Sequence, residues 1–317
     1  MTYRIENTSY AGFKAITLES SVMSVTVIPE LGAKIVSMLY KPTSKEWLIG
    51  AGSRGLRTVD YGSDYGQADL SGWDECCPTI VACDYPAQGP FHGRALPDHG
   101  ELWSIPWSAR VEGEAVTCEV EGRALPYSFS RTLSYVDDDT FRMAYRLTNL
   151  SDEPLSLFWC AHPLFRATEH TEMIMPDEVT ELLCVDGGKH LTAGKKYAWP
   201  DGDGQLRGGL SRIGSAESKD SRKFYVDGKV EQGVTGLYEQ DSKEYLILEW
   251  LPEQLPYLGA WINEGEVMEE AVCALEPCNG FYDKLDDAYG RDQLLHLSPR
   301  QTAEWQLDVR LGRGAWR

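Results

Sequence analysis

Apolar and polar residues alternate one by one over long parts of the chain. Residues 140–149 read TFRMAYRLTN and residues 303–312 read AEWQLDVRLG, and in both segments every second side chain is large and apolar. A period of two predicts a β-strand with one buried face, because successive side chains of a strand point to opposite sides. The apolar faces are predicted to consist of Phe141, Met143, Tyr145 and Leu147 in the first segment and of Trp305, Leu307, Val309 and Leu311 in the second.

Further runs rich in β-branched and aromatic residues predict more strands. They occupy residues 22–40, 116–122, 127–136, 153–162, 222–230 and 244–252. Most are bounded by Gly, Pro, Asn or Asp, and Asp227–Gly228 predicts a hairpin turn. No long amphipathic helix interrupts these runs. Strands that follow one another without helices predict an all-β protein, built of antiparallel sheets packed face to face.

One stretch departs from the strand pattern without marking a domain boundary. Residues 186–221 are rich in Gly, Asp and Lys, yet strand patterns continue on both sides. We therefore interpret the stretch as a long loop within one domain that covers residues 1–317, and as a candidate rim of a site. No repeat of fixed period is present.

Composition restricts the class of partner. With 42% hydrophobic and 25% charged residues, the chain can form a sizeable core, and its net charge is −19. Such a charge disfavours binding to nucleic acid or to anionic membrane surfaces, and it is compatible with a neutral small molecule. The first residues show no secretory signal, and no run reaches the roughly 18 apolar residues of a membrane span. A cytoplasmic protein is expected.

The sequence lacks the usual signatures of metal and cofactor chemistry. Cys76 and Cys77 are adjacent, Cys273 and Cys278 are separated by four residues, and no paired C-x-x-C or H-E-x-x-H motif occurs. We interpret the eight cysteines as reduced thiols and expect neither a metal nor an organic cofactor. The motifs of acyl transfer, nucleotide hydrolysis and hydride transfer are also missing.

Two of the six histidines lie in unusual surroundings. His99 lies between an acid and Gly100, which predicts a tight turn that presents the imidazole. His162 follows a strand run and precedes Pro163, which cannot donate to a sheet ladder. His170, His190 and His296 are interpreted as structural or exposed residues.

Carboxylates suggest a partner for these histidines. Glu276 ends an apolar strand run directly before a proline, where it is either an exposed edge residue or a functional group. Trp73, Asp74 and Glu75 combine an indole with two acids, which suits stacking and hydrogen bonding to a sugar and suits a buried structural tryptophan equally well. A histidine and carboxylate set with many aromatics favours proton transfer on a neutral polyol.

Five short motifs together resemble one known family. GAKIVSM, GWDECCPTI, DHGELW, HPLF and LEPCNGFYDKL occur in the order seen in aldose 1-epimerases, the galactose-mutarotase-like proteins, and the resemblance covers residues 29–287. It implies a large antiparallel β supersandwich. It also implies that His99 binds the sugar, that His162 is the general acid and that Glu276 is the general base. Leu164 stands where the family's motif has an aromatic residue.

The resemblance implies an isomerase that interconverts the α and β anomers of a free aldose. Glu276 would take the proton of the C1 hydroxyl while His162, its pKa raised by a neighbouring carboxylate, protonates the ring oxygen. The two side chains are expected to face each other across a cleft with the pyranose between them. In the turn before the cleft, Asp98 would fix the tautomer of His99 and Trp103 would anchor the backbone.

The sequence is compatible with more than one kind of sugar ligand. Trp73, Asp74, Glu75 and Arg94 are predicted to contact the sugar together with His99. Arg94 and Arg166 leave room for a hexose 6-phosphate, although an arginine that holds the phosphate in one relative has no counterpart after His99. A non-catalytic carbohydrate-binding protein is the other alternative. The identity of the sugar and the oligomeric state do not follow from the sequence.

Overall fold

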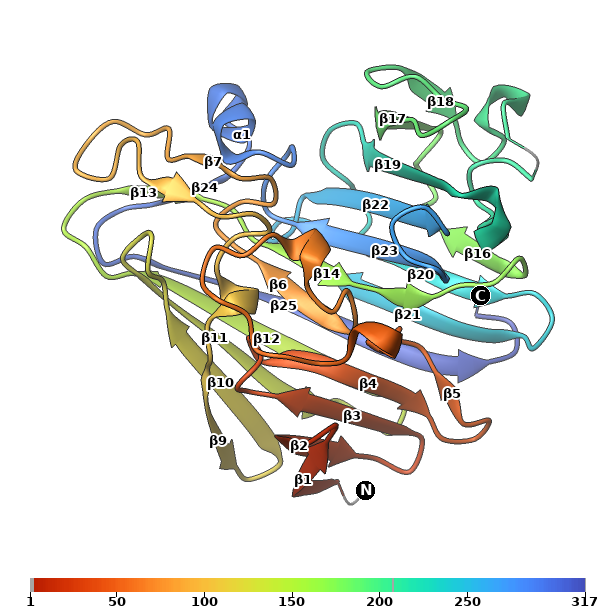
Figure 1. The fold of residues 1–317 in the computed structure, drawn as a ribbon, viewed down its shortest axis with the longest axis horizontal. Helices are drawn as coiled ribbons and strands as arrows, with labels where there is room; N and C mark the ends of the chain where they lie inside the picture. Colours follow the sequence, from red (N-terminus) through yellow and green to blue (C-terminus); the bar gives the residue numbers. More distant parts are fainter. Residues whose placement is uncertain (1–2, 207, 317) are drawn as a thin grey trace.

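Two large β-sheets make up most of the computed structural model, which describes residues 3–206 and 208–316 (Figure 1). The larger sheet contains β1 (Arg4–Tyr10), β2 (Phe13–Glu19), β3 (Met23–Ile28), β4 (Lys34–Tyr40), β5 (Lys45–Glu46), β6 (Trp73–Cys76), β14 (Cys160–Pro163), β15 (Phe165–Arg166), β17 (Glu181–Asp186), β18 (Lys196–Ala198), β19 (Asp220–Val226), β22 (Tyr257–Glu264) and β23 (Ala271–Cys278). The smaller sheet contains β9 (Ser108–Glu112), β10 (Ala115–Glu121), β11 (Tyr127–Tyr135), β12 (Thr140–Asn149), β16 (Thr171–Ile174), β20 (Val234–Glu239), β21 (Glu244–Trp250) and β25 (Thr302–Arg313).

Short elements complete the described part of the chain. Two small sheets pair β7 (Cys83–Asp84) with β8 (Ala95–Leu96) and β13 (Leu155–Leu157) with β24 (Leu295–Leu297). One α-helix, α1 (Leu285–Arg291), and five 3-10 turns occur among the described residues: η1 (Gly52–Arg54), η2 (Tyr65–Gln67), η3 (Leu102–Ser104), η4 (Gly202–Gly204) and η5 (Ala216–Ser218). None of the helices within residues 3–206 and 208–316 could span a bilayer.

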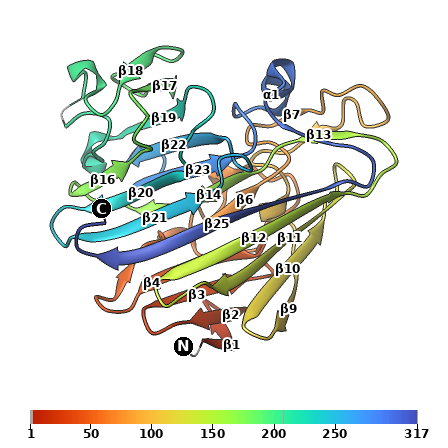
Figure 2. The same ribbon diagram turned by 180° about the vertical axis from the view of Figure 1, so that it is seen from behind.

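Strand order confirms the predicted all-β, antiparallel architecture. The larger sheet runs β1-β2-β3-β4-β6-β14-β23-β22-β19-β17-β18, and the smaller one runs β16-β20-β21-β25-β12-β11-β10-β9. The ladders that join these strands are antiparallel, as in the register of β12 with β25, where Tyr145 lies opposite Trp305. Figure 2 shows the smaller sheet from behind, with β25 and β12 near its middle.

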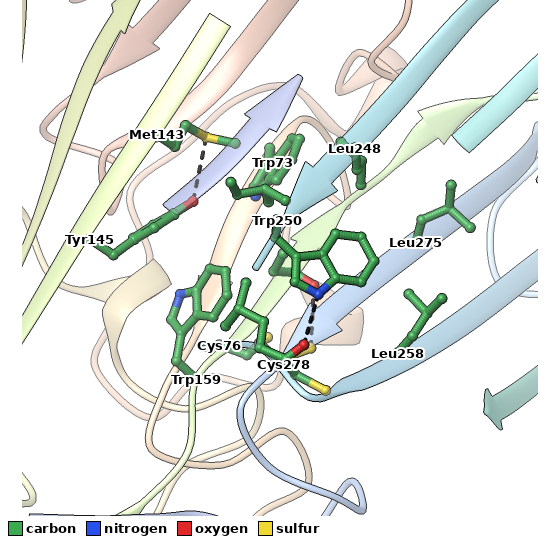
Figure 3. Close-up of a cluster of buried hydrophobic side chains, with 14 of the residues drawn as sticks. Trp73, Cys76, Met143, Tyr145, Trp159, Leu248, Trp250, Leu258, Leu275 and Cys278 are labelled. Carbon is green, nitrogen blue, oxygen red and sulfur yellow. Dashed lines mark hydrogen bonds between the residues drawn. The ribbon is translucent and has the colours of Figure 1, made fainter. Parts of the chain in front are cut away.

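The core lies between the two sheets, where the alternating apolar faces meet. Met143 and Tyr145 of the smaller sheet face Trp73 and Leu275 of the larger one, and each is 2% exposed or less (Figure 3). The predicted apolar face of 140–149 is therefore correct. The face predicted for 303–312 is also buried, including Leu307 and Val309 at 0% exposure.

The structure corrects two details of the predicted connections. Asp227–Gly228 does not close a hairpin, because β19 belongs to the larger sheet and the next strand, β20, belongs to the smaller one. The stretch 186–221 is not without strands, since it contains β18, η4 and η5 and reaches the start of β19. It lines a cavity of about 630 Å³ beside Arg222 and Glu264.

Candidate active site

Neighbouring strands at the centre of the larger sheet bring the candidate residues together (Figure 1). On β14 and β23, Cys160 lies opposite Cys278, so His162, two residues after Cys160, comes opposite Glu276, two residues before Cys278. Residues paired across a ladder point to the same face of a sheet, and successive residues alternate between faces. Leu275 lies in the core between the sheets, so Glu276 and His162 point away from the smaller sheet. The sheet register therefore accounts for the meeting of two residues that are far apart in the sequence.

His162 and Glu276 lie next to each other at the wall of a cavity of about 250 Å³. Nε2 of His162 is 4.0 Å from Oε1 of Glu276. The cavity is lined by Tyr65, Gly66, Leu70, Ile80, Val81, His99, His162, Leu164, Lys223, Trp261, Val267, Met268, Glu276 and Asp283. The prediction that a pyranose lies between the two side chains is wrong, because 4.0 Å leaves no room for a ring. A bound molecule must lie over both groups.

The turn around His99 has the predicted construction. His99 (φ 56°) and Gly100 (φ 69°) are both left-handed, and a Cβ on Gly100 would lie 2.1 Å from the carbonyl oxygen of Cys77. Nδ1 of His99 is 3.0 Å from the Asp98 carboxylate, and the indole N–H of Trp103 donates to the carbonyl of Asp98 at 3.0 Å. The turn thus fixes the imidazole at the cavity.

His99 and His162 form one aromatic group with Tyr65. The ring of Tyr65 stacks on His99 at 4.1 Å, and the two imidazoles are nearly perpendicular at 4.9 Å. Asp98 also accepts from the backbone N–H of Tyr65 at 2.9 Å. One carboxylate therefore holds both the histidine and the tyrosine that stacks on it, and its hydrogen bond to His99 helps to lower its pKa although burial opposes this.

A lysine on β19 balances the charge of Glu276. Nζ of Lys223 is 2.9 Å from Oε2 of Glu276 and 3.0 Å from Oδ1 of Asp283. Burial opposes its charge, but Asp283 and Glu276 together raise the pKa of Lys223 well above its usual value, so it is an ammonium group. Oε1 of Glu276 has no hydrogen-bond partner among the described residues and faces His162.

Burial shifts the pKa values of the pair in opposite directions. It raises the pKa of Glu276, and Lys223 opposes this shift. Burial also lowers the pKa of His162 well below 6.5, and the nearby charges of His99 and Lys223 add to the effect. The expected rise in the pKa of His162 is wrong, because loss of water around the imidazolium outweighs the attraction of the carboxylate.

Two residues predicted to bind sugar lie on the wrong face of the sheet. Trp73 and Glu75 are both fully buried and point toward the smaller sheet, where the Glu75 carboxylate accepts hydrogen bonds from Arg131 and from the indole of Trp159. Neither lines the cavity. Burial raises the pKa of Glu75 to about 7, against the effect of Arg131. These two residues pack between the two sheets, away from the cavity.

Asp74 and Arg94 also fail to line the cavity. Asp74 is 1% exposed and lies behind His162, its partner in the β6–β14 ladder. Arg94 is exposed, donates to the carbonyl of Ala124 at 3.0 Å and lies over the ring of Phe91. The long stretch 186–221 contributes no residue to this cavity either, so its predicted role as a rim is wrong here.

Sequence reasoning missed Tyr65, Lys223 and Asp283. Tyr65 lies in an irregular segment, and no spacing links it to His162. Lys223 had a weak signal, since a charged residue within the strand run 222–230 is unusual on a buried face. Asp283 belongs to the same motif as Glu276, LEPCNGFYDKL, seven residues further along the chain. No group of three or more His, Cys, Asp or Glu side chains in the described residues is arranged to hold a metal ion.

Comparison with known proteins supports the fold independently. No family model and no curated protein sequence matches the chain. Among solved structures, the chain is similar to a galactose mutarotase-like protein from Lactobacillus casei, with 16% identity, a TM-score of 0.71 and coverage of 94% of this chain and 100% of the other. A galactose mutarotase-like protein from Clostridium acetobutylicum matches at 13% identity and a TM-score of 0.70, with 99% of both chains covered.

A third structure, of a galactose mutarotase related enzyme from Lactobacillus acidophilus, matches at 16% identity and a TM-score of 0.68, covering 96% of this chain and 99% of that one. The chain thus has the galactose mutarotase-like fold that its motifs predicted. At these identities the likeness concerns the fold. What the site does must be argued from its own geometry.

Proposed function

We propose that this protein is an aldose 1-epimerase, which interconverts the α and β anomers of a free aldose by general acid–base catalysis. The observation that carries the proposal is the 4.0 Å approach of Nε2 of His162 to Oε1 of Glu276 at the cavity wall. Anomer exchange requires one proton to leave the C1 hydroxyl and another to reach the ring oxygen. Both oxygens are bonded to C1, so an acid and a base only a few ångströms apart can serve both.

The rest of the cavity supports a pyranose. His99 offers a fixed imidazole for a sugar hydroxyl, and Trp261, Leu164 and Met268 provide an apolar wall for the C–H groups of the ring. The ring opens to the aldehyde, the C1–C2 bond rotates, and closure on the other face reverses both proton transfers. Neither transfer requires a redox change.

The charges favour an unphosphorylated sugar. Among the described residues that line the cavity, Lys223 is the one lysine or arginine, and it is paired with Glu276 and Asp283. A phosphate group would meet two carboxylates there and no free cation. If hexose 6-phosphates compete with free hexoses for turnover, the phosphorylated alternative gains support.

Replacement of Glu276 by Gln tests the proposal. A freshly dissolved α-anomer of each of several aldoses is followed by polarimetry, and Glu276→Gln is expected to reduce the acceleration by about 10²–10⁴-fold, because one positioned proton-transfer group is lost. Glu269→Gln is the matched control, since Glu269 is exposed and does not line this cavity. It should equilibrate the sugars as fast as the parent.

Two outcomes would contradict the proposal. Retained activity in Glu276→Gln would remove Glu276 from the reaction. A parent protein that binds aldoses in calorimetry yet leaves their equilibration rate unchanged would instead be a non-catalytic carbohydrate-binding protein.

A further inference from the structure

A chain of buried polar groups runs from His162 away from the cavity. Nδ1 of His162 is 3.2 Å from the hydroxyl of Tyr65, which is 3.0 Å from Oδ2 of Asp74. Nζ of Lys34, on β4, lies 2.9 Å from the same Oδ2. All four side chains are at least 95% buried. Four polar groups shielded from water in a continuous row are costly unless each hydrogen bond has a donor and an acceptor.

Lys34 sets the direction of the hydrogen bonds in this row. It also contacts the Asp69 carboxylate at 2.8 Å. Burial opposes its charge, but Asp74 and Asp69 raise the pKa of Lys34, so it is an ammonium group that can only donate. Oδ2 of Asp74 must therefore accept from Lys34.

The same oxygen also accepts from Tyr65. Burial raises the pKa of Asp74, and Lys34 opposes this shift. The direction of the bond does not depend on that balance. Oδ1 of Asp74 is the oxygen without a partner, so a proton on the carboxyl group would reside there and leave Oδ2 an acceptor. In either state the hydroxyl proton of Tyr65 points to Asp74.

This direction determines which nitrogen of His162 carries the proton. A tyrosine hydroxyl has one proton, and it is used toward Asp74, so its oxygen can only accept from His162. Nδ1 of His162 is then protonated. In a neutral imidazole the lone pair is left on Nε2, the nitrogen that faces Glu276 and the cavity.

We propose that Tyr65 and Asp74 are positioning residues that hold a proton on Nδ1 of His162, so that Nε2, the nitrogen that faces Glu276 and the cavity, is the one that exchanges a proton with the sugar. This inference rests on the proposed function. The bond from C1 to the ring oxygen breaks, and the C1–O1 bond becomes a carbonyl. His162 and Glu276 each exchange one proton with the C1 hydroxyl or the ring oxygen, and closure on the other face reverses both transfers.

The surroundings of both groups suit proton transfer at Nε2 of His162. Burial lowers the pKa of His162, which favours the neutral imidazole whose Nδ1–H donates to Tyr65. An imidazolium formed at His162 lies beside the Tyr65–Asp74 row, and the Glu276 carboxylate lies beside Lys223. Each charge thus has a group of opposite sign behind it, as in preorganised catalytic sites. The ring of His99, in the turn after β8, also packs edge to face against the ring of His162.

The tautomer is measured directly by ¹⁵N NMR of protein labelled at histidine. We expect His162, assigned by the loss of its signals in His162→Gln, to show a protonated Nδ1 and an unprotonated Nε2 at neutral pH. Tyr65→Phe keeps the ring that packs on His99 and removes the acceptor for Nδ1–H. Its spectrum should shift toward the Nε2-protonated tautomer, and kcat should fall on the order of 10²-fold with little change in KM.

Tyr61→Phe is the matched control. It also removes a tyrosine hydroxyl bonded to a carboxylate, here Glu101 at 2.8 Å, outside the cavity. Its His162 signals and kcat should match those of the parent.

A protonated Nε2 in the parent protein would overturn the inference, and so would Tyr65→Phe with unchanged tautomer and kcat. If Tyr65→Phe does not fold, the parent spectrum alone decides. The spectrum needs no turnover: a protein with the expected tautomer that equilibrates no aldose would contradict the proposed function and leave the assignment of the Nδ1 proton intact.

Discussion

Two consecutive left-handed residues, His99 and Gly100, place an imidazole at the cavity by bringing the backbone against Cys77. The close approach depends on the missing side chain of Gly100, because a Cβ there would meet backbone atoms that cannot move independently. A residue without any chemistry of its own thereby determines where His99 lies.

Gly100→Ala should destabilise the protein and displace His99. Gly113→Ala is the matched control, since Gly113 is also left-handed (φ 61°) but a Cβ there has no atom within 4 Å. We expect Gly100→Ala to lower the free energy of unfolding by about 1–3 kcal/mol more than the control does. Urea unfolding measures the difference, and equal losses in the two variants would show that the contact with Cys77 costs nothing.

Asp74 and Glu75 show how adjacent acids acquire unrelated roles. They are neighbours in β6, and the pleat sends Asp74 toward His162 and Glu75 toward Arg131. The interpretation that both acids contact one sugar treated sequence neighbours as spatial neighbours. The strand period alone would have separated them.

At the scale of elements, β25 illustrates how alternation builds the core. It pairs with β12 on one side and β21 on the other, and it presents Trp305, Leu307 and Val309 to the larger sheet. A strand hydrogen-bonded on both edges has little freedom to adjust when a side chain is removed.

Leu307→Ala should therefore leave a cavity and lower the free energy of unfolding by about 2–5 kcal/mol. Gln306→Ala, one residue earlier on the exposed face, should change it by about 0.5 kcal/mol or less. Chemical denaturation of both variants checks the prediction, and similar losses would mean that the two faces of β25 are not distinct in solution.

At the scale of the whole molecule, a buried ion pair joins the two sheets. Glu75 of β6 bonds to Arg131 of β11, and both side chains are 0% exposed. The pKa of Glu75 is raised from 4.5 to about 7 in the folded protein. Between these values the unfolded chain has lost the proton that the folded protein keeps. The contribution of Glu75 to stability is therefore complete below pH 4.5 and is lost as the pH rises through about 7.

This linkage predicts that the stability due to Glu75 falls with rising pH by up to about 1.4 kcal/mol per unit in that window. The free energy of unfolding is measured from pH 4.5 to 7 for the parent and for Glu75→Gln, which cannot titrate. The difference, parent minus variant, should decrease as the pH rises. Parallel curves would place the pKa of Glu75 near its ordinary value.

Most of the local structure and several candidate site residues follow from the sequence alone. Alternation specified strands and their buried faces because burial on one side of a pleated strand requires an apolar residue at every second position. Motif order indicated the fold, and the D-H-G turn indicated how His99 is presented.

Contacts between segments that are distant in the sequence set which groups meet and which proton states they adopt. The register of β14 with β23 places His162 beside Glu276. Tyr65, from a distant segment, contacts His162, and Lys223 of β19 pairs with Glu276. The direction of each pKa shift depends on water excluded by elements distant in sequence, and that exclusion has no counterpart in the local pattern. Four residues predicted to contact the sugar do not line the cavity: Trp73, Asp74, Glu75 and Arg94. The local sequence does not state which face of a sheet, or which loop, lines a cavity.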